Sequence, residues 1–109
     1  MVNWLRSIRT RFLKARLISA LRDVVELLDA VNERQWAFRL RGDLERLEED
    51  DGSAVDHLLS AYGGMGSFND LYICEQNGHK ITADGFDQVN RKLRRLSTGM
   101  WILARGLNR

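Results

Sequence analysis

Few side chains in this 109-residue sequence could carry out catalysis or bind a metal. The soft metal ligands are His57, His79 and Cys74, and no two of them have the spacing of a metal-binding pair. A zinc site needs four protein ligands, or three and a water, so we expect no metal site. Ser67, His57 and Asp70 could form a nucleophilic triad, but no nucleophile elbow surrounds Ser67. We therefore predict no catalytic residues, no cofactor and no enzymatic activity, with His57 as a surface histidine.

A glycine-rich stretch begins at Gly63 and could form a phosphate-binding loop. Such a loop follows a strand and precedes a helix whose N-terminal amides face the anion. Here we expect a helix before the stretch and extended chain after it, and the sequence lacks Gly-Lys-Ser/Thr. We interpret the stretch as a structural loop that ends a helix, with backbone amides that donate to polar side chains. The expected loop residues are Gly63, Gly64, Gly66, Ser67, Asn69 and Asp70.

The formal net charge of +2 conceals three regions. Residues 1–22 hold six bases and no acid, residues 23–75 hold thirteen acids and four bases, and residues 76–109 hold seven bases and two acids. Six acids form what we call the acidic edge: Glu45, Glu48, Glu49, Asp50, Asp51 and Asp56. The acidic edge could bind a charged partner. Alternatively, arginines of the N-terminal segment could neutralise it within the fold: Arg6, Arg9, Arg11 and Arg16.

The basic N-terminal segment mixes arginines with large apolar residues: Trp4, Leu5, Ile8, Phe12 and Leu13. This mixture could bind an anionic membrane surface or nucleic acid, and it also fits an organelle transit peptide. We favour an ordinary first helix whose arginines meet the acidic middle of the chain. Any binding to nucleic acid or lipid by this segment, or by the bases of residues 91–95, is then expected to be weak and non-specific.

Apolar periodicity predicts about four helices packed as a small bundle. The first covers about residues 3–31, where an apolar stripe starts at Leu17, and a phase break between Phe12 and Leu17 indicates a bend or a separate docking of the first turns. Asn32 and Ser53 look like N-caps of the second and third helices. The pairs Arg39–Asp43 and Arg41–Glu45 should stabilise the second helix. The buried positions expected in the last three helices are Trp36, Leu40, Leu44, Leu47, Val55, Leu58, Leu59, Tyr62, Phe86, Val89, Leu93, Leu96, Met100, Leu103 and Leu107.

Between the third and last helices we predict one short β-hairpin. Residues 71–74 favour β-structure, Asn77-Gly78 is a strong hairpin turn signal, and residues 80–82 would return. The fold class is therefore mainly α, or α+β, in one domain over residues 1–109. Residues 1–16 form a basic helical extension in this prediction, and residues 63–82 form the glycine loop and hairpin.

Several protein classes are disfavoured by composition. The single cysteine allows no intramolecular disulfide, so nothing indicates an oxidising compartment. No apolar run has the length of a membrane span, and the N-terminus does not look like a signal peptide. We expect a cytoplasmic protein.

The run GGMGSFNDLYICEQNGHKIT, residues 63–82, resembles a family of small bacterial proteins of uncharacterised function. The shared motif consists of Gly63–Ser67, Asn69–Leu71 and Asn77–His79, and the resemblance covers about residues 17–107. It implies no activity by itself. By analogy, small bacterial proteins without catalytic groups are often immunity proteins of toxins.

The leading hypothesis is therefore a non-catalytic protein-binding protein that neutralises a cognate toxin. The acidic edge is its expected partner-binding surface. The alternative is a nucleic-acid or anionic-membrane surface binder that uses the basic N-terminal and C-terminal helices. The sequence leaves the oligomeric state open.

Overall fold

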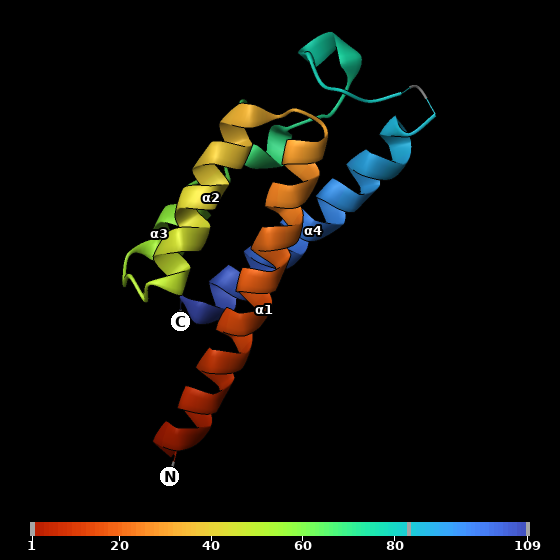
Figure 1. Cartoon of the computed structure of the whole chain (residues 1–109). Coiled ribbons are helices and arrows are strands. Elements are labelled where there is room, and N and C mark those ends of the chain that lie inside the picture. Colours follow the sequence, from red (N-terminus) through yellow and green to blue (C-terminus); the bar gives the residue numbers. More distant parts are fainter. Residues whose placement is uncertain (1, 83, 109) are drawn as a thin grey trace.

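The computed structural model describes residues 2–82 and 84–108. Its four helices are α1 (Val2–Ala30), α2 (Arg34–Glu48), α3 (Ala54–Leu59) and α4 (Phe86–Leu107). Two short 3-10 turns, Phe68–Asp70 and Glu75–Asn77, lie between α3 and α4. The helices form an elongated bundle of 54 × 23 × 21 Å, in which the N-terminal turns of α1 project beyond the other helices (Figure 1). The mainly helical fold predicted from the sequence is confirmed.

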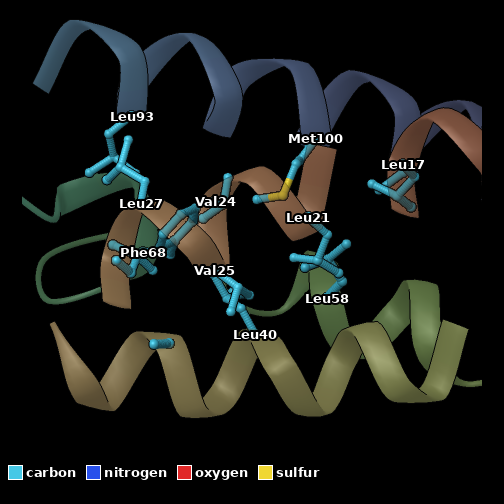
Figure 2. Close-up of a cluster of buried hydrophobic side chains, with 14 of the residues drawn as sticks. Leu17, Leu21, Val24, Val25, Leu27, Leu40, Leu58, Phe68, Leu93 and Met100 are labelled. Atoms are coloured by element: carbon cyan, nitrogen blue, oxygen red, sulfur yellow. The ribbon is translucent and has the colours of Figure 1, made fainter. Parts of the chain in front are cut away.

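The core lies between α1 and the other helices, because α1 packs along both α2 and α4. The predicted stripe of α1, from Leu17 through Leu28, is fully buried. Figure 2 shows this stripe between Leu93 and Met100 of α4 and Leu40 of α2. Phe68 closes one end of the core, with its ring centroid 5.4 Å from Trp36 and 5.8 Å from Tyr62.

The starts of α2 and α3 differ from the predicted capping boxes. Asn32 adopts a left-handed conformation at φ 65° after α1, and Glu33 is the N-cap of α2 through its carboxylate, which accepts from the amide of Trp36. Ser53 precedes α3, but its hydroxyl donates to Asp51 rather than capping the helix. Oδ1 of Asn32 accepts from the side chain of Arg34 at 2.9 Å, so both side chains make local polar contacts instead of capping a helix.

The predicted hairpin is wrong, since residues 71–82 contain no strand. The backbone groups of the two extended segments bind other elements instead of one another. Ile73 donates its N–H to Oδ1 of Asn90 in α4 and accepts from Asn90 Nδ2, both at 2.8 Å. The amide of Lys80 donates to the carbonyl of Val31 at 2.8 Å. The predicted turn at Asn77-Gly78 is present, because Gly78 ends a 3-10 turn with φ 83°.

Within the described residues, none of the helices is both long and apolar enough to cross a lipid bilayer.

Candidate functional site

The acidic edge divides into two sets of residues. Three of its members serve the fold: Glu48, Asp50 and Asp51. Arg22 of α1 donates to Glu48 at 2.6 Å, and Lys14 of α1 forms an ion pair with Asp50. Asp51 accepts from the amide and the hydroxyl of Ser53, at 2.9 and 2.7 Å, and these bonds hold its pKa below the usual value.

The other three members of the acidic edge are Glu45, Glu49 and Asp56. All three are exposed, and no ion pair involves them among the described residues. Their carboxylates are therefore available to an external partner. The bases that neutralise the edge are Lys14 and Arg22, rather than the N-terminal arginines proposed from the sequence.

A buried carboxylate lies next to this edge, although the sequence did not single it out. Asp43 of α2 is fully buried, and its Oδ1 accepts from Nδ1 of His57 in α3. Its Oδ2 is buried without a hydrogen-bond partner among the described residues. The nearest other base is Arg46, whose guanidinium lies 3.9 Å from Oδ1. His57 is thus the partner that makes this buried charge tolerable, and it is only partly exposed.

Arg39 connects α2 to the end of α3 through hydrogen bonds. Its guanidinium donates to the carbonyl of His57 at 2.9 Å and to the hydroxyl of Ser60 at 2.8 Å, and it lies 5.5 Å from the ring centroid of Trp36. The predicted pair Arg39–Asp43 therefore does not form. Arg41 likewise binds Asp29 of α1 instead of the predicted Glu45.

The outer face of α2 carries a groove of about 360 Å³ beside the Asp43–His57 pair. Its lining includes Phe38, Gly42 and Glu45, together with three arginines: Arg39, Arg41 and Arg46. Phe38 is 78% exposed, which is unusual for a phenylalanine on a well-packed helix. Gly42 has no side chain to fill the space between Phe38 and Glu45, so the groove is open on a rigid helix.

The glycine loop closes on its own polar side chains. The amide of Gly63 donates to Asn69 Oδ1 and that of Gly66 donates to Asp70 Oδ2, both at 3.0 Å. The hydroxyl of Ser67 donates to the carbonyl of Gly64 at 2.6 Å. The amides of Gly63 and Gly66 and the hydroxyl of Ser67 are therefore engaged within the loop.

The Asn77-Gly78-His79 motif has a structural explanation. The buried His79 accepts at Nδ1 from the amide of Cys74 at 3.0 Å, so its Nε2 carries the proton and donates to Glu33 at 2.9 Å. Asn77 donates to the carbonyl of Tyr72 at 3.0 Å. These bonds attach the loop before α4 to the junction of α1 and α2.

The two histidines among the soft metal ligands have different partners. His57 pairs with Asp43, whereas His79 pairs with Glu33 and the backbone of Cys74. Among the described residues, no group of three histidine, cysteine or acidic side chains could hold a metal ion.

Residues 29–82 match a family model described as "Domain of unknown function (DUF6966)". This match is consistent with the resemblance to an uncharacterised family seen in the sequence. The matched segment contains the acidic edge, the groove on α2, the glycine loop and the Asn77–His79 motif. No curated protein and no solved structure matches the chain.

Proposed function

We propose that this chain is a non-catalytic binding protein that recognises a basic protein surface through the outer face of α2. The observation that carries the proposal is Phe38, which stands exposed beside an open groove on a rigid helix. Aromatic side chains are enriched at the centres of protein interfaces, where their burial supplies much of the binding free energy. A phenylalanine that remains in water costs free energy which a partner would recover.

The acids beside Phe38 support a basic partner, because Arg39 and Arg41 of the groove already bind Ser60 and Asp29. Glu45 follows Phe38 by seven residues, so the two side chains lie on one face of α2, and Glu49 is the C-cap residue of the same helix. The acidic edge contributes Glu45, Glu49 and Asp56 to an external partner, because its other members are used in the fold. Exposed charges of one sign accelerate encounter with a partner of opposite sign.

The concrete form of this proposal is neutralisation of a bacterial toxin by an immunity protein. Many toxins act on nucleic acid and use basic clefts, and an acidic surface with an aromatic anchor would block such a cleft. The link to immunity proteins rests on analogy with other small bacterial proteins.

The test is co-expression with the protein encoded immediately upstream in the same genome. We expect the chain to restore growth that this protein inhibits, and the purified pair to bind. Phe38→Ala should weaken binding by tenfold or more, since truncated interface anchors cost about 2 kcal/mol. Wild-type affinity for Phe38→Ala, or the absence of both protection and binding, would overturn the proposal.

Two triple variants separate the docking charges from the structural ones. E45S/E49S/D56S and E48S/D50S/D51S each remove three negative charges from the acidic edge. We expect the first variant to slow association markedly and the second to slow it less. The association rates are compared at equal concentrations of folded protein. Equal association rates for the two variants would show that only net charge matters.

A further inference from the structure

The N-terminal half of α1 has an apolar stripe that touches nothing else in the described chain. Its residues are Trp4, Leu5, Ile8 and Phe12, whose exposed fractions lie between 46% and 59%. Near the end of α4, Gly106 lies against Leu13, whose side chain would be 3.4 Å from a Cβ at Gly106. Figure 1 shows that the turns before this point project from the bundle. We call residues 3–16 the basic arm.

The stripe faces away from the core because of the phase break in the sequence. At about 100° per residue, the five-residue step from Phe12 to Leu17 turns the apolar face by about 140°. The helix continues through this step without a break. Figure 1 shows no sharp kink at this step, and the first turns of α1 project away from the rest of the described chain.

Arginines border the stripe on both sides. The same helical pitch places Arg11 along one border and Arg9 and Arg16 along the other. The guanidinium of Arg16 lies 5.6 Å from the ring centroid of Phe12. Among the described residues, no acid forms an ion pair with Arg6 or with any of these three arginines. The basic arm thus combines an exposed apolar stripe with arginines that have no acidic partner in the fold.

We propose that the basic arm docks on the surface of an anionic phospholipid bilayer, a function separate from the protein-binding face of α2. Amphipathic helices with Trp, Phe and Leu on one face and arginine on the other lie in the interface, with the apolar face among the acyl chains. Arginines at the border extend to the lipid phosphates while their methylenes remain in apolar surroundings. Each base near an anionic surface strengthens this attraction.

Two other occupants fit the basic arm less well. A second copy of the arm would bring like charges together, since residues 1–22 contain six bases and no acid, and like charges oppose association. Single-stranded nucleic acid stacks on aromatic rings, which leaves Leu5 and Ile8 without a role. A bilayer interface uses the aliphatic, aromatic and basic side chains together.

The test is co-sedimentation of the full chain with vesicles. We expect binding to vesicles of phosphatidylcholine and phosphatidylglycerol in equal parts, and much less to pure phosphatidylcholine. Phe12→Ser should weaken binding by about tenfold, the effect of losing one buried aromatic side chain. The matched control, Ile102→Ser, removes an equally exposed apolar side chain from α4 and should bind as the wild type does.

A second pair of variants tests the charges. R9Q/R16Q should weaken binding by about fivefold for each arginine lost, whereas R91Q/R94Q removes two exposed bases of α4 and should have little effect. Circular dichroism melts would verify that each variant is folded.

Several results would overturn the proposal. They are equal binding to neutral vesicles, equal effects of Phe12→Ser and Ile102→Ser, and self-association in sedimentation that depends on Phe12. Binding of single-stranded or duplex DNA that depends on Arg9 and Arg16 but not on Phe12, without binding to anionic vesicles, would assign the arm to nucleic acid.

Discussion

Tyr62 follows α3 and directs its hydroxyl toward α4. The hydroxyl donates to the carbonyl of Ser97 at 2.6 Å. Burial disfavours the phenolate and raises the pKa of Tyr62 to about 12, although the side chain of Ser97 opposes part of this increase. The phenol is therefore a neutral tether between the end of α3 and the middle of α4.

The raised pKa predicts a loss of stability in alkali. An unfolded tyrosine ionises near pH 10.0, whereas folded Tyr62 stays protonated to about pH 12. Its contribution to the free energy of unfolding is fully present below pH 10 and is lost as pH rises through this window. Urea unfolding across the window should show this decrease in the wild type, and a smaller one in Tyr62→Phe. Tyr72→Phe, at an exposed tyrosine, is the control and should decrease as the wild type does. Equal decreases in wild type and Tyr62→Phe would contradict the assignment.

For Asp43, the sequence could predict burial but not the hydrogen-bond partner. It lies three residues after Leu40 and four before Leu47, so helical periodicity places it on the buried face of α2. The pairing with Arg39 rested on i,i+4 spacing alone and ignored this placement. The actual partner, His57, comes from another helix, and its position depends on how α3 packs against α2. The exposure of Phe38 could also be predicted, because Phe38 lies off the stripe formed by Leu40, Leu44 and Leu47.

Among the elements, the loop from residue 71 to residue 82 departs most from its local signals. The carboxylate of Glu33 connects this loop to the start of α2. Its Oε1 accepts from His79 in the loop, and its Oε2 accepts from the amide of Trp36. β-propensity and Asn-Gly turns describe neighbours in sequence, and these signals located the turn at Gly78 correctly. They could not show that Asn90 of α4 would satisfy the backbone of Ile73, because that contact depends on tertiary packing.

The glycine loop gives a prediction that distinguishes its three glycines. Gly66 has φ 83°, whereas Gly63 and Gly64 do not have positive φ, and an added Cβ would meet open space at all three. Gly66→Val should therefore lower the free energy of unfolding by about 1 kcal/mol or more through backbone strain. Gly63→Val and Gly64→Val should change it much less. Thermal melts of the three variants would test this, and three equal shifts would show that backbone conformation is not the cause.

At the scale of the whole molecule, some charged side chains form ion pairs between helices and others face solvent. Lys14 and Arg22 of α1 bind acids at the end of α2, so the first helix and the acidic edge stabilise one another. The sequence predicted the segregation of charge but not these partners, because they depend on the register of α1 against α2. The periodic apolar stripes, by contrast, predicted four helices and most of the core. Periodicity shows which face of a helix is buried, whatever the alignment of that helix with its neighbours.

The two triple variants of the acidic edge should also differ in stability. E48S/D50S/D51S removes two ion pairs with α1 and the Asp51–Ser53 bonds, and Asp50 adopts a left-handed φ of 59° that aspartate tolerates better than serine. We expect it to lose about 1–2 kcal/mol of unfolding free energy, since each exposed pair contributes up to about 1 kcal/mol. E45S/E49S/D56S should stay within about 0.5 kcal/mol of the wild type. Urea unfolding measures both, and a greater loss in E45S/E49S/D56S would reverse the division of roles.

The distribution of the core has a consequence for how such a segment can be inherited. Residues 29–82, the segment matched by the family model, end before α4 and begin at the close of α1. Yet Leu40, Leu58 and Phe68 are buried in a core to which α1 and α4 contribute half of the buried apolar residues. Transferred alone to another gene, the segment would expose apolar side chains that α1 and α4 cover here, and we expect it to be unstable on its own. A recipient protein would have to cover this apolar surface with elements of its own.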